Sequence, residues 1–418
     1  MAGPQQQVSA SQLNSAARYA IKARGVRMLQ QIFAQTITPA NQPTVTVNPR
    51  NVGLINGFWI KVVAVLNNGS GETANLTDFG PANILSQIQF NDLSNNTRIQ
   101  TTGWHLAFIN AWKSRRAFLS ALVGAGGTNT GLQTSALQAA FDDPINFGSN
   151  WTLNSAPATI ANDAASGAST CTMWYWVPLA YNPDNPQAPD LRGAVYANVV
   201  NATMQLFLSF AGTFGSSVCA ANGADSTSSI YVQAAGGGTA SAMTMTSATV
   251  TVYQDYWDQI PVGPQGLLLP VLDLSTIYEL KYTNVNNMTA GIDFPYQYAN
   301  FRDFLSTIAV YVNNGTTGAR GVGADINTWA LQSANFTNIW KVEPALIAGF
   351  SRNHIGVDFP PGVAFFDSRT KPISTTQYGN MQLVLNAAAA SNNPYMLVAV
   401  EDFSIVQQLS MAGSLAAS

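Results

Sequence analysis

The chain has 418 residues, a formal net charge of −3, and 9% charged against 47% hydrophobic residues. This length exceeds what one hydrophobic core usually supports and predicts two domains of roughly 200 residues each. The slight negative charge argues against a protein that coats nucleic acid, because neutralising phosphates needs clustered Lys and Arg. The low charged fraction favours either flanks buried against other copies of the chain or a neutral secreted binding protein.

Residues 1–43 differ in character from the rest of the chain. Between residues 8 and 37, apolar residues recur at steps of three, four and seven, and no acidic residue occurs. The basic residues of this segment are Arg18, Lys22, Arg24 and Arg27. The pattern predicts an exposed amphipathic helix that ends at the prolines that follow. Such a helix can lie on an anionic membrane or pack as an arm on a neighbouring subunit, and the sequence leaves both readings open.

From residue 44 onward the hydrophobic period becomes two, which is typical of β-strands. The predicted strands of the first half are residues 44–47, 57–66, 87–90, 98–101, 170–177, 204–210, 229–233 and 249–256. Short strands without β-α-β spacing indicate antiparallel sheets packed as a sandwich. Residues 121–135 and 211–242 are rich in Gly, Ala, Ser and Thr and lack periodicity, so we expect surface excursions there.

A proline- and glycine-rich joint separates two strand-rich halves. Its residues are Pro261, Gly263, Pro264 and Gly266. Prolines lack the ladder N–H group and glycines favour unusual dihedral angles, so no regular element continues through this stretch. The sequence therefore predicts a first domain over residues 44–258, a stiff connector over 259–267, and a second domain over 268–418.

Short sequence segments recur in the same order in both halves, such as MQLFL at residues 204–208 and MQLVL at residues 381–385. Kept order with unequal gaps is what duplicated sandwiches with different loops would show. Chance is the alternative, because strand-like words are common in all-β chains.

Residues that carry catalysis or bind metals are sparse. His105 and His354 are far apart and have no neighbouring ligand set, so we expect no metal site. The carboxylate pairs Asp142-Asp143 and Asp255 with Asp258 suit acid–base chemistry on a sugar, but such residues more commonly cap turns. The loop at residues 318–323 lacks the Lys-Ser/Thr pair of a phosphate-binding loop.

The aromatic residues and the cysteines do not indicate a specific binding or redox site. Trp104, Trp174 and Trp176 suit a sugar-stacking platform, although aromatic residues at strand spacing more often serve the core or an interface. Cys171 and Cys219 stand alone, which predicts neither a zinc site nor a redox motif. No apolar run reaches the ~18 residues that span a bilayer, and no signal peptide is expected. We therefore expect synthesis in a reducing cytoplasm.

Several segments resemble the tectivirus major capsid protein family, a double jelly roll of the adenovirus-hexon lineage. They occur in family order and cover residues 44–409. The segments are LTDFGPANI (76–84), GWHLAFINA (103–111), APATIA (156–161), WYWVPLAY (174–181), VYQDYWDQIPVG (252–263), FPYQYANFRDFLSTIAVY (294–311) and DFPPGVAFFDSRTKPISTTQYGN (358–380). The glycine-rich excursions depart from the family pattern.

The resemblance implies an all-β fold of two tandem eight-stranded jelly rolls, which the predicted N-terminal helix would precede. It implies a homotrimer whose six jelly rolls form a pseudo-hexagonal capsomer. Neighbouring capsomers, with minor capsid and vertex proteins, would tile the icosahedral shell of a bacteriophage over an internal membrane. The chain would be made in the host cytoplasm and reside in the virion capsid. The basic residues of the N-terminal arm lead us to expect that this arm contacts the membrane lipid.

The resemblance implies no catalytic residue, cofactor or metal, and no direct contact with nucleic acid. A jelly-roll carbohydrate-binding protein and a glycan-cleaving enzyme are the competing functions, since one fold can host many activities.

Overall fold

The protein was analysed as a computed structural model. The residues that the structure describes are 25–69, 73–77, 79–113, 156–157, 159–160, 168–182, 190–198, 202–220, 227–233, 243–260, 276–286, 288–316, 318–335, 338–355, 359 and 362–405.

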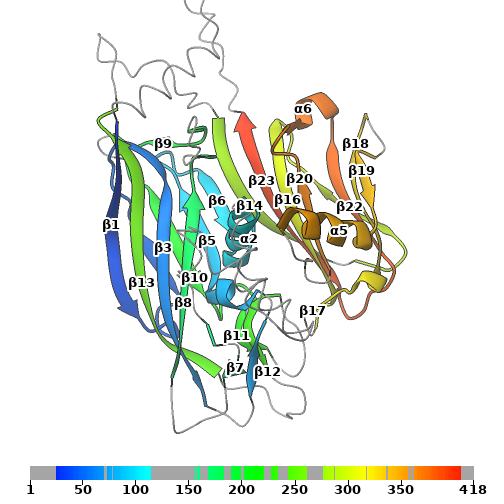
Figure 1. The fold of residues 1–418 in the computed structure, drawn as a ribbon, viewed down its shortest axis with the longest axis horizontal. Coiled ribbons are helices and arrows are strands. Elements are labelled where there is room, and N and C mark those ends of the chain that lie inside the picture. Colours follow the sequence, from blue (N-terminus) through cyan, green and yellow to red (C-terminus); the bar gives the residue numbers. More distant parts are fainter. Residues whose placement is uncertain are drawn as a thin grey trace, which may run out of the picture.

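Two facing sheets and a smaller sheet at one end form the first half (Figure 1). The first sheet has the order β1 (Val26–Ile37), β13 (Met243–Asp258), β3 (Leu54–Asn68), β8 (Ser169–Pro178), with β9 (Val195–Tyr196) also paired to β3. Opposite it lie β6 (Thr97–Thr101), β5 (Leu85–Asn91), β10 (Gln205–Phe210) and β2 (Thr44–Val47). The small sheet contains β11 (Ser217–Ala220), β12 (Ser229–Gln233), β4 (Ala74–Leu76) and β7 (Thr159–Ile160).

Alternation along β3 explains why these strands pack as a sandwich. Its side chains alternate between buried and half-buried, so that Phe58, Ile60 and Val62 are fully buried. Phe58 meets Phe90 of the facing sheet with ring centroids 5.4 Å apart. Burying each such side chain stabilises the fold by about 1.5–3 kcal/mol, which fixes the register of the strand.

The second half repeats this arrangement. One sheet holds β17 (Ala319–Arg320), β16 (Arg302–Asn314), β23 (Tyr395–Ile405) and β14 (Thr276–Val285), with β20 (Val363–Asp367) and β21 (Ile373–Ser374) paired to β16. Its partner sheet holds β15 (Asp293–Gln297), β22 (Met381–Ala387), β18 (Ile326–Ser333) and β19 (Trp340–Val342). The helical elements are η1 (Gly80–Ile84), α2 (Gly103–Lys113), η2 (Gly323–Asp325), α5 (Pro344–Ile355) and α6 (Thr375–Tyr378).

The two halves share one sheet and one core. β14 pairs in parallel with β6, Leu280 opposite Ile99, which joins the strands of both halves into a ten-stranded sheet. Helix α2 lies between the halves (Figure 1), and buried side chains of both halves belong to one continuous hydrophobic cluster. The halves are therefore joined by packing as well as by the chain.

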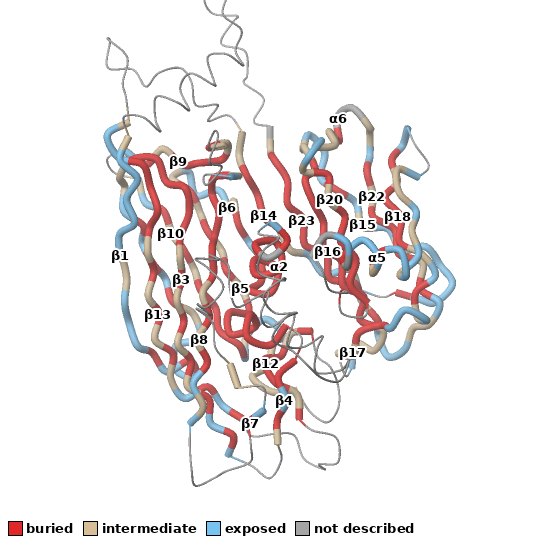
Figure 2. Tube along the Cα trace, viewed as in Figure 1, coloured by how far each residue is buried: buried red, intermediate tan, exposed pale blue. Residues whose placement is uncertain are grey.

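The all-β fold and all of the predicted first-half strands are confirmed, with residues 44–47 and 229–233 matching β2 and β12 at both ends. The N-terminal helix is wrong for residues 26–37, which form β1 along β13 from Val26↔Asp258 to Ile37↔Ala248. Strand pairing with β13 outweighs the helical spacing of the segment. Figure 2 shows β1 as a largely exposed outer strand. Residues 1–24 lie outside the described part of the chain.

The expected surface excursion over residues 211–242 is wrong where β11 and β12 form. Ile230 and Tyr231 of β12 are fully buried, and β12 pairs with both β4 and β11. The Tyr231 hydroxyl donates a hydrogen bond to the Pro157 carbonyl at 2.8 Å. Composition assigned β11 to a loop, and its pairing with β12 accounts for the difference. β12 lies within the same stretch but was also predicted as a strand. Residues 121–135 lie outside the described residues.

Candidate functional site

Where the two halves meet, helix α2 brings aromatic side chains against the second half. Phe108 lies 4.9 Å from Phe359, and Trp112 lies 4.3 Å from Phe365, between ring centroids. Trp104, Phe108 and Trp112 recur every four residues, the spacing that places side chains on one helix face. This is the signal that could have identified α2 from the sequence.

The contact between the two halves, which we call the seam, contains a buried carboxylate, Glu401 of β23. It is fully buried and accepts hydrogen bonds from Tyr278 at 2.5 Å and Ser306 at 2.6 Å. The Lys113 ammonium at the end of α2 lies 2.6 Å from it, with 27% of the Lys113 side chain exposed. Burial would raise the pKa of Glu401, but the charges of Lys113 and Arg369 and the donated hydrogen bonds lower it to about 2. Glu401 is therefore ionised and ties α2 to the second half.

A second ion pair lies beside the first. Arg369 donates from Nε to Asp367 Oδ1 at 2.9 Å and from Nη2 to Oδ2 at 2.7 Å. Trp112 Nε1 donates to the same Oδ2 at 2.7 Å, which links the first half to this pair. Burial would raise the pKa of Asp367, but its hydrogen bonds to Arg369 and the Arg369 charge lower it to about 2.

The segment around Arg192 closes the seam on the side of the first half. Its guanidinium forms a fork with Asp190, Nη2 to Oδ2 at 2.7 Å, and lies 4.5 Å from the centroid of the Phe403 ring in the second half. Gly193 follows with φ +85°, and a Cβ atom there would sit 2.4 Å from the Cβ of Tyr278. Glycine is required here for two reasons: other residues are strained at a positive φ, and their Cβ atom would clash with Tyr278. The chain thereby approaches β14 closely.

The predicted connector and the predicted membrane-facing residues are largely outside the described residues. This holds for Pro261, Gly263, Pro264 and Gly266, and for Arg18, Lys22 and Arg24. The fourth basic residue, Arg27, lies on β1, where its Nη2 meets Asp255 Oδ2 at 2.5 Å with 34% of its side chain exposed. Asp255 also accepts from Asn56 at 3.1 Å, so it serves a cross-strand ion pair. Asp142 and Asp143 lie outside the described residues.

The histidines are not brought together at a metal site. His105 is fully buried on α2 with Nδ1 hydrogen-bonded to the Thr101 hydroxyl, and burial lowers its pKa to about 3. His354 lies on α5. Within the described ranges, no group of three or more His, Cys, Asp or Glu residues could hold a metal ion. In the same ranges, no helix is both long and apolar enough to cross a membrane.

The three tryptophans do not form one platform. Trp104 is buried and stacks on Phe79 at 5.2 Å. Trp174 and Trp176 lie on the opposite face of β8 from its core side chains, where Trp174 stacks on Tyr253 at 6.0 Å. Cys171 and Cys219 are both free thiols, the first buried.

Comparison with known proteins shows where this architecture recurs. The family described as "P3 major capsid protein N-terminal" matches residues 5–260, and "P3 major capsid protein C-terminal" matches residues 275–417. Major capsid protein P3 of Enterobacteria phage PRD1 is 39% identical over 403 residues, which is 96% of this chain and 93% of that protein.

Solved structures share the fold at low identity. The crystal structure of the STIV MCP matches with a TM-score of 0.58 at 11% identity, covering 94% of this chain and 100% of that one. A structure of Sulfolobus Turreted Icosahedral Virus matches with a TM-score of 0.59 at 11% identity, over 93% and 94% of the two chains. The double jelly roll expected from the sequence is thereby confirmed.

Proposed function

Since this chain belongs to the P3 major capsid protein family of tectiviral phages and is a component of the virion capsid, we propose that it assembles into the shell as a homotrimer. The 39% identity to a major capsid protein over nearly the whole chain carries the capsid function. In the proposed trimer, the two jelly rolls of each chain supply two of the six that form a pseudo-hexagonal capsomer. Minor capsid and vertex proteins would be its further partners.

The seam supports this proposal, because a capsomer needs its two jelly rolls at a fixed angle. The shared sheet, the aromatic contacts of α2 and the ion pairs at Glu401 and Asp367 all resist rotation of one half against the other. The Glu401 and Asp367 carboxylates are each bound by a cation, which supports a structural rather than a catalytic role.

The outer face of the first sheet supports contact between copies. Trp59, Trp174 and Tyr253 are half-buried there. On the neighbouring edge strand β1, Leu29 lies on the same face as Tyr253 and is 60% exposed, while Met28 points to the other side of this edge and is 42% exposed. Aromatic residues and methionine are enriched in protein interfaces. Such surfaces are expected in a chain that assembles with itself.

We expect the purified protein to have three times the 44.4 kDa mass of the chain without any added ligand. An obligate trimer of this kind should bury more than about 2,000 Å² at each subunit contact. Multi-angle light scattering at micromolar and nanomolar concentrations would measure this. A folded monomer at micromolar concentration would contradict the homotrimer.

The N-terminal arm is our proposed contact with an internal viral membrane. Arg18, Lys22 and Arg24 would each gain about 1 kcal/mol near an anionic bilayer, an attraction that salt weakens. Arg27 would gain less, because the Asp255 carboxylate already offsets its charge. Arms linked in one trimer act at high effective concentration, so weak contacts can add up to firm binding.

Deleting residues 1–24 should abolish flotation of the trimer with anionic liposomes at low salt and leave the trimer intact, because β1 is kept. The full-length trimer should float and be released by added salt. Changing Arg18, Lys22 and Arg24 together to Gln should mimic the deletion, whereas the matched variant Arg27→Gln should float like the parent. Equal flotation of all forms would assign the arm to packing on a neighbouring subunit.

A further inference from the structure

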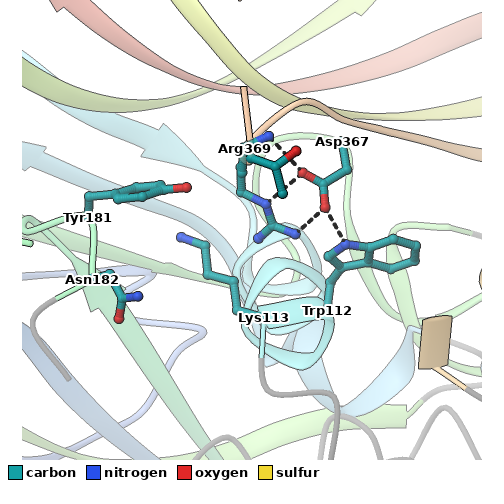
Figure 3. A pocket seen from close by; sticks show the side chains of 7 residues that line it. Trp112, Lys113, Tyr181, Asn182, Asp367 and Arg369 are labelled. Atoms are coloured by element: carbon teal, nitrogen blue, oxygen red, sulfur yellow. Dashed lines mark hydrogen bonds and ion pairs between the residues drawn. The ribbon is translucent and has the colours of Figure 1, made fainter. Parts of the chain in front are cut away.

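A pocket of about 290 Å³ opens on the seam between the two halves. Figure 3 shows Lys113 and Trp112 of α2 on one side, Arg369 and Asp367 of the second half facing them, and Tyr181 and Asn182 at the rim. Both halves of the chain therefore contribute charged side chains to one hollow.

The pocket is lined by two cations, Lys113 and Arg369, and by one carboxylate, Asp367. The carboxylate that pairs with Lys113 is Glu401, which is fully buried. Asp367, the partner of Arg369, is held by Arg369 and by Trp112. Both carboxylates already accept these hydrogen bonds, while the Lys113 ammonium also stacks over the Tyr181 ring at 5.1 Å. The lining therefore offers the Lys113 ammonium and the Arg369 guanidinium as cations, and the Asp367 carboxylate beside them is already bound by Arg369 and Trp112.

Arg369 has one buried donor, Nη1, with no hydrogen-bond acceptor among the residues that the structure describes. Its side chain is only 10% exposed, and its Nε and Nη2 atoms are both taken by Asp367. Among the described residues, the buried Nη1 atom finds no acceptor. A buried donor without a partner costs about 1–3 kcal/mol, and more when the group is charged. The site therefore lacks an acceptor, and a negatively charged oxygen would suit both Arg369 and Lys113.

We propose that this pocket binds a small oxyanion, a carboxylate or inorganic phosphate, between Arg369 of the second half and Lys113 of the first. A guanidinium presents planar donors that match the oxygens of either ion, and the ammonium adds a point charge. Because the two cations come from different halves, a bound oxyanion ties the jelly rolls together and stabilises the seam.

Equilibrium dialysis with radiolabelled phosphate and, separately, labelled acetate tests the site on the full-length protein. Ionic strength is held constant with chloride. We expect the parent protein to bind at least one of the two ions saturably, with about one site per chain. Whichever ion binds shows whether the pocket takes a carboxylate or a phosphate. Arg369→Lys keeps the charge but loses the guanidinium donors, so affinity should fall at least about fivefold.

Arg192→Lys is the matched control, because Arg192 forms the same fork with a carboxylate two residues before it, Asp190, and does not line the pocket. It should bind the ion like the parent. A rise in thermal midpoint with the bound ion, seen in the parent and in Arg192→Lys but not in Arg369→Lys, is the second expected result. Failure of the parent to bind either ion, or equal binding by Arg369→Lys, would overturn the proposal.

Discussion

Replacing Lys113 with Met should lower the free energy of unfolding by about 3–5 kcal/mol, because it leaves the Glu401 carboxylate buried without its main cation. Glu401 is fully buried, and the Lys113 ammonium lies 2.6 Å from it. Methionine keeps the length and apolar packing of the lysine stem, so the loss reports the charge. Chemical unfolding followed by tryptophan fluorescence, at fixed protein concentration, would measure the change.

Two comparisons isolate the buried charge as the cause. Lys281→Met removes a lysine that also lies 2.6 Å from a glutamate, Glu279, but its side chain is 42% exposed and Glu279 keeps Arg302 at 2.6 Å. We expect a loss below about 1 kcal/mol there. Adding Glu401→Gln to Lys113→Met should recover much of the stability, since the carboxylate charge left without its lysine is then removed as well. If both lysine variants lost equal stability, the seam ion pair would not be a special contributor.

The strands of the first half could be predicted because their burial alternates. In β13 one face is buried in the sandwich, and this imposes the period of two that its sequence shows. β3 was predicted from a run that is apolar on both faces, and its outward-facing side chains are indeed mostly half-buried. β1 was not predicted as a strand because its side chains show no such alternation. It is an edge strand whose residues are mostly exposed, so no buried face imposes alternation. Its partner, β13, is more than 200 positions away in the chain, and local spacing carries no information about that pairing.

The seam could not be predicted for a related reason. Lys113, Asp367 and Glu401 are separated by long stretches of sequence, and single charged residues in a chain with 9% charge give no sign of which partner they meet. The predicted connector joins the two halves along the chain. The described contacts between the halves come from α2, β6, β14 and the segment around Arg192. Only the spacing of Trp104, Phe108 and Trp112 offered a local hint.

Two buried groups should give the parent protein a nearly flat dependence of stability on pH between 6.5 and 5. Burial lowers the pKa of His105 from its ordinary value of 6.5 to about 3, with Glu401 opposing and Lys113 adding to the shift. Burial raises the pKa of Asp402 from 3.8 to about 7, against the charges of Arg302 and Lys281 and with those of Glu279 and Glu401. The two shifts act on stability in opposite directions.

The signs follow from which state binds the proton. Below pH 6.5 the unfolded chain protonates His105 and the folded chain does not until about pH 3, so acidification removes stability. Between pH 7 and 3.8 the folded chain holds the Asp402 proton that the unfolded chain releases, so acidification adds stability. Each effect amounts to about 1.4 kcal/mol per pH unit, and in the shared window they cancel.

Replacing either residue should therefore reveal the pH dependence of stability that the other residue causes. Between pH 6.5 and 5, His105→Gln should become more stable by about 2 kcal/mol and Asp402→Asn less stable by about 2 kcal/mol, each relative to its own value at pH 6.5. The double variant should return to the flat profile of the parent. Unfolding free energies measured at both pH values test this, because the comparison within each variant removes any constant cost of the substitution. A flat profile in both single variants would mean that neither group changes its protonation on unfolding, which would contradict the burial argument for both.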